Sequence, residues 1–506
     1  MHLHHFRLHL FTAFGPDKIG PRILQANADV LCAPLAVVFR KSLEEGVVPD
    51  DWRKGKITPI FKSGSRMTPG NYRPVSLTSI ACKIMESIIK DNMLLHLIKF
   101  ELIKESQHGF MTSKSCQTNL IDYLNTLTKL VDQGYDVDVI YLDFAKAFDK
   151  VPHQRLLLKL EAHGISGKVV RWIESWLTDR SQRVVLNGSA SEWLPVSSGV
   201  PQGSVLGPIC FVIFINDLDD VLDLVGGFVS KFADDTKYGR VIRNDEDRQR
   251  MQRDIDKLLQ WADTWQMQFN YKKCKIMHFG GKNPHYNYCM GGFAPAGTVL
   301  EVVTEEKDIG VVVSNTLKPS AQCAKAAKKA NAILGQMSRA FHYRDNVFVR
   351  LYKSYVRPHL EFAVQAWSPW FVKDIELLER VQRRAVNMVL GLKATSYEGK
   401  LKELGLTTLQ ERRERGDMIQ VWKYLHEQNP GGDKLFERSS EQHNRPSRHT
   451  AKSWNVCNEF SRLEVRKNFF TSRCTEKWNS LPHAVQGAPD LNTFKNDYDE
   501  FFASNK

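Results

Sequence analysis

The chain has 506 residues, 42% of them hydrophobic, which suits several packed units and is too apolar for a disordered protein. Its 70 Lys and Arg outnumber 57 Asp and Glu, and the formal net charge of +13 favours a polyanionic partner such as nucleic acid. No run of about 18 apolar residues and no Cys-x-x-Cys pair is present, which argues against a transmembrane helix, a disulfide framework and a zinc knuckle.

The first part of the chain predicts a helix, a strand and a second helix. Residues 1–11 lack the apolar core and cleavage site of a secretory signal, so we expect an intracellular protein of the nucleus, the cytoplasm or both. Apolar residues recur at helical spacing from Leu24 to Gly46 and from Ile80 to Leu97. Between them, residues 52–64 predict a short strand that runs into a basic turn.

The middle of the chain alternates strands and helices. Strands are predicted at 137–143, 183–186, 228–232, 236–242 and 275–279. Helices are predicted from 152, and at 166–180, 209–218 and 245–265. A loop rich in Gly and Pro, 197–208, precedes the apolar helix, and the turn 233–235 joins two strands into a hairpin. This order predicts an α/β fold with a partly antiparallel sheet.

Beyond about residue 315 the pattern becomes mostly helical. The clearest predicted helices lie at 321–341, 346–355, 374–390 and 409–426. Residues 428–433 predict a loop, and residues 439–452 are polar and basic enough to be flexible.

Three carboxylates stand where strands end. Asp143 closes an apolar strand, and Asp234 and Asp235 occupy the hairpin turn. If these strands are neighbours, the acids converge at one end of a sheet, where two Mg²⁺ ions about 3.5–4 Å apart can be held for nucleotidyl transfer. The alternative is structural, since an Asp-Asp pair is usually a solvated turn and a strand-ending Asp is often a helix cap.

The surrounding motifs resemble those of non-LTR (LINE-type) retrotransposon reverse transcriptases, particularly the jockey and chicken-repeat groups. The segments that match their motifs A to E are Tyr141–Val151, Gly199–Pro208, Phe232–Thr236, Asn270–Lys275 and Asp308–Val311, preceded by the fingers signatures Asn71–Pro74 and Gln107–Phe110. Five ordered motifs are far more specific than any one of them. Group II intron and telomerase-like enzymes are the nearest alternative families, and the residues of motifs A and C match them less well.

The resemblance implies a right-hand polymerase with fingers, an α+β palm whose antiparallel sheet carries helices, and a helical thumb. We expect an N-terminal remnant or helical lead-in at 1–42 and a reverse transcriptase domain at 43–312, with fingers at about 43–135 and palm at about 136–312. A thumb-like helical region would span 313–400, and a helical or flexible C-terminal region 401–506. Neither the family's endonuclease nor a ribonuclease H is expected in this chain.

The resemblance also implies roles for the acids. Asp143 and Asp234 would ligate two Mg²⁺ ions, with Mn²⁺ as an alternative, and Asp235 would be the supporting third carboxylate. The backbone carbonyl of Phe144 would complete the coordination of one ion. Phe148 falls at the family's sugar gate, where an aromatic ring excludes a ribose 2′ hydroxyl, although a core aromatic is the alternative.

Other polar residues would bind the substrates. Gln202, between two glycines, would contact the incoming nucleotide and the template base. Lys62 and Arg73 would grip the triphosphate. Lys273 would protonate the departing pyrophosphate, unless it is a solvated lysine or the role belongs to a neighbouring lysine.

Cations also recur on the first predicted thumb helix. Lys325, Lys328, Lys329 and Arg339 lie largely three and four residues apart, which predicts one basic stripe able to follow phosphates. Runs of arginine at 380–384 and 412–415 would extend it, although a solvated helix face explains them equally well.

Two functions follow from these patterns. The first is RNA-directed DNA synthesis, with an RNA template, a DNA primer and deoxynucleoside triphosphates as partners. The alternative is a retroelement-derived protein that binds nucleic acid and is catalytically silent. The oligomeric state is left open by the sequence.

Overall fold

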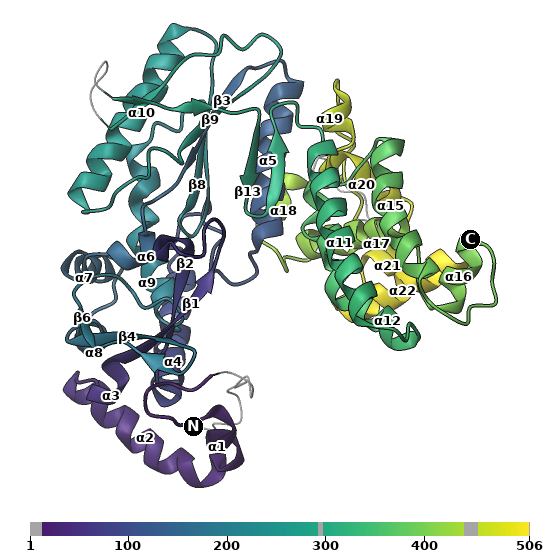
Figure 1. Ribbon diagram of the computed structural model, residues 1–506. Helices are drawn as coiled ribbons and strands as arrows, with labels where there is room; N and C mark the ends of the chain where they lie inside the picture. The colour runs from purple at the N-terminus through teal and green to yellow at the C-terminus, as the bar shows by residue number, and fades with distance from the viewer. Residues whose placement is uncertain (1–12, 292–296, 440–453, 505–506) are drawn as a thin grey trace, which may run out of the picture.

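A five-stranded mixed sheet forms the centre of the first of two lobes in this computed structural model, which describes residues 13–291, 297–439 and 454–504 (Figure 1). The strands follow the order β12-β9-β3-β8-β7 and are antiparallel to their neighbours except β12 and β9. The predicted α/β fold with a partly antiparallel sheet is therefore confirmed. The strands are β3 (Val137–Leu142), β7 (Gly227–Phe232), β8 (Asp235–Val241), β9 (Lys275–Phe279) and β12 (Glu301–Val302).

Strand β3 is buried along its whole length because helices cover both faces of this sheet. Successive side chains of a strand point to opposite faces. Ile140 therefore lies in the core formed with α9 (Gly207–Phe214) and α10 (Asp245–Thr264), whereas Tyr141 lies in the core formed with α5 (Cys116–Asp132). The short elements of this lobe are α6 (Ala147–Lys150), η3 (Asn216–Val221), β10 (Cys289–Met290), β11 (Thr298–Val299), β13 (Glu305–Asp308) and β14 (Val311–Ser314).

A second sheet lies toward the N-terminal end of the first lobe (Figure 1). Its strands are β1 (Lys54–Phe61), β2 (Tyr72–Leu77), β4 (Arg180–Leu186), β5 (Ser189–Ala190) and β6 (Leu194–Val196). The helices around it are α1 (Pro21–Ala26), α2 (Ala28–Glu45), α3 (Asp50–Arg53), η2 (Pro69–Asn71), α4 (Ile80–Lys99), α7 (His153–Ala162) and α8 (Lys168–Leu177). The helix predicted from Leu24 to Gly46 is split at Asn27, and it ends where Gly46 adopts a left-handed conformation with φ 68°.

The second lobe is helical and includes every long helix that the sequence predicts beyond residue 315. Its principal helices are α11 (Ser320–Ala340), α12 (Asn346–Leu351), the π-helix η4 (Tyr352–Val356), α15 (Val372–Asn387), α17 (Leu409–Leu425), α20 (Phe470–Asn479) and α22 (Leu491–Ser504). The shorter ones are α13 (Pro358–Glu361), α14 (Val364–Trp367), α16 (Tyr397–Glu403), α18 (Gly432–Leu435), α19 (Glu464–Lys467) and α21 (His483–Gln486).

One hydrophobic core connects α5 with this helical lobe on both sides of residue 400. It contains Leu120 of α5, Leu334 of α11, Leu378 of α15, Val421 of α17 and Phe494 of α22. The 400/401 division therefore crosses a continuous core, and the domain boundaries stay a prediction.

The arginines at 412–415 make contacts within this lobe. Arg412 forms an ion pair with Glu361, Arg415 forms one with Asp499, and the Arg413 side chain is buried. Arg412 and Arg415 are therefore ion-paired but partly exposed, and a role of this run beside the predicted basic stripe stays a prediction.

Within the described residues, no helix combines the length and apolar character needed to cross a bilayer. The prediction about a secretory signal at residues 1–11 lies outside the described residues. The flexible segment predicted at 439–452 also lies outside them, apart from Ser439.

Candidate active site

The fold brings the three predicted acids to one end of the first sheet. In the antiparallel pair of β3 and β8, Leu142 lies opposite Thr236. The next residue on each strand is Asp143 on one side and Asp235 on the other, and Asp234 occupies the turn between β7 and β8. The strands that carry the acids are therefore neighbours, which is the condition for the predicted convergence of the three carboxylates.

The acids disfavour one another's negative charge. Burial raises the pKa of Asp234, and the charge of Asp143 raises it further. Desolvation by neighbouring protein atoms, followed by the charge of Asp234, raises the pKa of Asp235 to about 6, although its side chain reaches solvent. Because like charges gather here, a bound cation would relieve their repulsion.

Asp143 has one carboxylate oxygen, Oδ2, that lies 3.5 Å from the Lys273 ammonium. Its Oδ2 is buried and accepts no hydrogen bond in the described part of the chain. Carboxylate oxygens are the ligands that Mg²⁺ prefers, so this donor set fits such an ion. Across residues 13–291, 297–439 and 454–504, however, no three His, Cys, Asp or Glu side chains are arranged closely enough to enclose a metal. The three acids are therefore neighbours, but the described side chains do not form a closed metal-binding cluster.

Gln107 holds the acidic turn in place. Its Oε1 accepts hydrogen bonds from the backbone N–H of Ala233, at 2.9 Å, and of Gly109, at 2.8 Å. Ala233 has a left-handed φ of 55°, which is unfavourable for a residue with a side chain. A Cβ on Gly109 would lie 2.4 Å from Ala233 N, so only glycine permits this approach. Gln107–Phe110 matches a fingers signature, and no local pattern in the sequence indicates this supporting role.

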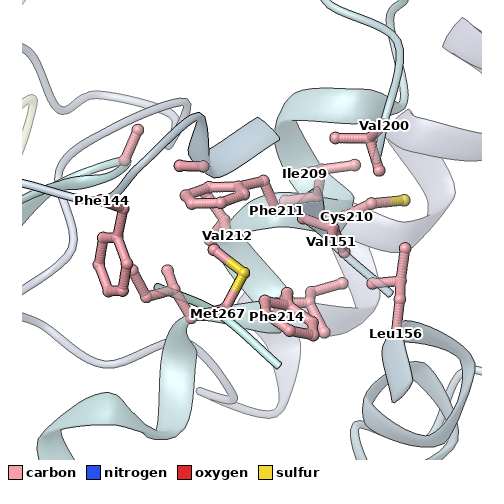
Figure 2. Packing of buried hydrophobic residues seen from close by; sticks show 14 of the residues in the cluster. Phe144, Val151, Leu156, Val200, Ile209, Cys210, Phe211, Val212, Phe214 and Met267 are labelled. Atoms are coloured by element: carbon pink, nitrogen blue, oxygen red, sulfur yellow. The ribbon is translucent and has the colours of Figure 1, made fainter. Parts of the chain in front are cut away.

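The Phe144 side chain lies in the core. The ring stacks on Phe269 with centroids 4.4 Å apart, and Figure 2 shows it among the buried residues. The adjacent peptide groups bond to residues 268–270. No hydrogen bond to the Phe144 carbonyl occurs within the described residues, so this oxygen is available for the predicted coordination.

Three of the predicted cations lie around the acids. Lys273 Nζ is 3.5 Å from Asp143 Oδ2, and its side chain is 67% exposed, which leaves it free to reach a ligand. Lys62 follows β1 and Arg73 lies on β2, and the side chains of both are exposed. Their positive charges oppose the rise in the pKa of Asp234, so both lie within electrostatic reach of the acids.

The Phe148 ring has one side in the core and remains partly accessible. It stacks on Phe211 with centroids 4.4 Å apart and meets the edge of Phe110 at 6.3 Å. Figure 2 places Phe211 on α9, inside the apolar core. A rigid, half-exposed ring suits a gate beside a nucleotide sugar, and it also has the packing that the core alternative requires.

Gln202 lies in a loop that packs against α6 and β2. Its Nε2 donates to Asp149 Oδ1 at 3.0 Å, and its carbonyl accepts from Ser76 N at 2.6 Å. A Cβ on Gly199 would lie 2.6 Å from the Asp149 backbone, and one on Gly203 would lie 2.6 Å from Ser76 O. The glycines therefore permit close packing, and a cleft of about 500 Å³ opens beside the loop.

The predicted basic stripe lies on α11. Lys328, Lys329 and Arg339 are exposed, whereas Lys325 is half-buried. Burial, followed by the positive charges of Lys307 and Lys329, lowers the pKa of Lys325. The stripe thus combines accessible cations with mutual repulsion, an arrangement that a polyanion would stabilise.

Sequence comparisons with known proteins agree with these features. The family model described as "Reverse transcriptase (RNA-dependent DNA polymerase)" matches residues 60–334, more than half of the chain. The RNA-directed DNA polymerase from mobile element jockey of Drosophila melanogaster is 26% identical over 76% of this chain and 43% of the relative. The probable RNA-directed DNA polymerase from transposon BS of the same organism is 23% identical over 79% of this chain and 45% of the relative. The chain thus spans less than half the length of these curated relatives. Among solved structures, telomerase from Candida albicans in complex with a telomeric RNA fragment has a TM-score of 0.40 and 12% identity, over 73% of this chain and 68% of that one.

Proposed function

Since the chain belongs to the reverse transcriptase (RNA-dependent DNA polymerase) family, we propose that it extends the 3′ hydroxyl of a DNA primer along an RNA template. The observation that carries this proposal is the meeting of Asp143, Asp234 and Asp235 at adjoining strand ends, where Asp143 Oδ2 accepts no hydrogen bond from the described residues. Deoxynucleoside triphosphates are the proposed substrates. An intracellular location belongs to the proposal because these substrates and RNA templates occur there.

The proposed cofactor is a pair of Mg²⁺ ions, with Mn²⁺ as an alternative. Asp143 and Asp234 would hold them, with Asp235 and the Phe144 carbonyl in support. When bound, such ions lower the pKa of a primer hydroxyl and neutralise a departing pyrophosphate.

The remaining site residues are proposed to position the substrates. Lys62 and Arg73 would bind the triphosphate, the first with a point charge and the second with a planar fork. Lys273 would donate a proton to the departing pyrophosphate, as its contact with Asp143 supports. Phe148 would exclude a ribose 2′ hydroxyl, and Gln202 would contact the new base pair. Fingers at about 43–135, palm at about 136–312 and thumb at 313–400 complete this proposal.

Primer extension on an RNA template with Mg²⁺ tests the proposed activity and its site. Wild-type protein should extend the primer, and Asp234→Asn should reduce the rate by about 10³-fold, since several kcal/mol of charge stabilisation depend on this carboxylate. Asp263→Asn, an exposed position on α10, is the matched control and should extend normally. Unchanged extension by Asp234→Asn would refute the assigned site.

The alternative function is nucleic-acid binding without synthesis, which the net charge and the stripe on α11 also support. Folded wild-type protein that binds a primer–template duplex in a salt-dependent manner, yet adds no nucleotide, would favour this alternative over polymerisation.

A further inference from the structure

A buried carboxylate on α4 contacts the loop that carries Gln202. Glu86 is 0% exposed, and its neighbours on the same helix, Met85 and Ile89, belong to the hydrophobic core. Removing a carboxylate from water is costly unless hydrogen bonds and opposite charge compensate. The buried guanidinium of Arg180 interacts electrostatically with Glu86 and supplies part of that compensation. The remainder must come from hydrogen bonds.

Both oxygens of Glu86 accept hydrogen bonds. Oε2 accepts from the backbone N–H of Val205, at 2.6 Å, and of Leu206, at 3.1 Å. Oε1 accepts from the Cys82 thiol at 3.2 Å. The two backbone donors lie 119 and 120 residues later in the chain. This one side chain therefore connects α4 to the end of the Gln202 loop.

The two N–H groups lie where α9 begins. The first N–H groups of a helix have no acceptor within it, and the N-cap residue Leu206 makes no side-chain hydrogen bond to them. The next group, Gly207 N–H, donates to Ser204 Oγ at 3.0 Å. A carboxylate at this end also interacts favourably with the helix dipole. Glu86 thus fixes the point at which the loop passes into α9.

The turn between Gln202 and Val205 has little freedom to absorb a displacement. Ser204 donates to the Pro201 carbonyl twice, from its N–H at 3.1 Å and from its hydroxyl at 2.8 Å. Gly203 has φ 115°, and a Cβ there would lie 2.6 Å from a backbone oxygen of β2. Because the turn is closed by hydrogen bonds and packed against β2, a shift of Val205 changes the position of Gln202.

The same loop borders the cleft of about 500 Å³, a volume in the range of small-molecule sites. Val200, Pro201 and Gln202 line this cleft together with Gly55 and Ile57 of β1. A ligand that enters the cleft therefore meets the loop a few residues before the two N–H groups that the buried carboxylate holds.

Packing alone does not require a carboxylate at this position. An apolar side chain of similar volume would fill the space without removing a charge from water. Only an acceptor of suitable length, however, can bond two successive N–H groups of the loop. The chemistry of Glu86 therefore indicates a geometric role.

We propose that Glu86 is a positioning residue for the new base pair. By holding Val205 and Leu206 it keeps Gln202 at one place beside the cleft, and it thereby sets how strongly a matched nucleotide is preferred over a mismatched one. Glu86 itself touches no substrate in this proposal. The inference rests on the proposed polymerase function, because it concerns how an incoming nucleotide is selected.

Two conservative variants separate the length of the side chain from its charge. Glu86→Asp keeps the negative charge beside Arg180 but shortens the side chain by one C–C bond, about 1.5 Å, so its oxygens no longer reach both N–H groups. Glu86→Gln removes the charge but keeps the length. Its amide oxygen can accept from both N–H groups, and its NH₂ can donate to Cys82 Sγ. A geometric role therefore predicts greater damage in Glu86→Asp than in Glu86→Gln.

The measurement is single-turnover incorporation of one matched and one mismatched deoxynucleotide on an RNA template with a DNA primer. In Glu86→Asp the apparent Kd of the matched nucleotide should rise about tenfold, and the preference over the mismatch should fall about tenfold. The maximal rate should stay within about threefold of wild type, because Asp143, Asp234 and Asp235 lie on other elements. In Glu86→Gln all three quantities should stay within about threefold of wild type.

Leu97→Ala is the matched control for a loss of stability in α4. Leu97 is 1% exposed and lies about three helical turns beyond Glu86. The cavity should lower the melting temperature and leave nucleotide preference unchanged. Wild-type preference in Glu86→Asp, an equal loss in Leu97→Ala, or a greater loss in Glu86→Gln would each overturn the positioning role alone. Absence of extension by wild-type protein would instead refute the proposed polymerase function and the inference with it.

Discussion

Replacing Gln107 by Leu should detach the acidic turn from its support. Gln107 is 0% exposed, and its Oε1 accepts two backbone N–H groups, from Gly109 and Ala233. A buried donor without a partner costs roughly 1–3 kcal/mol, so the two together would cost about 2–6 kcal/mol. Ala233 would also keep its left-handed conformation without compensation. If the displacement of Asp234 adds about 3 kcal/mol of this cost to the activation free energy, extension slows roughly 100-fold.

The assay compares Gln107→Leu with Gln382→Leu, at a glutamine of α15 that is also 0% exposed. Gln382 accepts from the Tyr352 hydroxyl at 2.9 Å and lies in the helical lobe, away from the acids. Both variants should lower the melting temperature, since each loses buried hydrogen bonds. Below that temperature, only Gln107→Leu should slow single-turnover extension. Equal rates in the two variants would refute a special role for Gln107 at the turn.

Three further predictions concern pH, sugar selection and duplex affinity. Because the pKa of Asp235 is raised to about 6, the folded state gains stability from its protonation at low pH and loses it as pH rises through 6. Asp235→Asn should therefore raise the melting temperature more at pH 8 than at pH 4, and an equal change at both would contradict the assigned pKa. Phe148→Val should increase the ratio of ribonucleotide to deoxynucleotide incorporation by about tenfold; a ratio that stays constant while the melting temperature falls would support the core alternative. Lys328→Gln/Lys329→Gln should reduce the slope of log Kd against log salt for a primer–template duplex by about 1–2, and an unchanged slope would show that neither lysine contacts phosphate.

Local signals predicted much of the candidate site. Asp143 follows a run of apolar residues, and the acid pair follows another, so each could be assigned to a strand end before any pairing was known. Helix α5 was missed although its signal is local. It begins with a capping box between Ser115 and Thr118, and it carries buried residues such as Leu120, Leu124 and Leu127 at helical spacing.

No local sequence pattern predicted the hydrogen bonds by which Gln107 supports the acidic turn. Gln107 and Ala233 are 126 residues apart, and their contact depends on a left-handed conformation in the turn. The same limit applies to Lys237, which looked like an ordinary strand residue and proved to be buried between Asp308 and Asn119. Sequence spacing cannot show which side chain lies across such a contact.

By itself, the sequence determined the order of strands and helices, the kinds of chemical group at each turn, and the positive charge. Periodicity and turn chemistry depend on residues close together in the chain, so these features can be predicted without a structure. Only the tertiary structure decided which cations remain available. Lys328 faces solvent, Lys237 is buried in an ion pair, and Arg412 holds two helices together. The reason is physical, because burial and charge pairing depend on long-range packing, which brings together residues from distant parts of the chain.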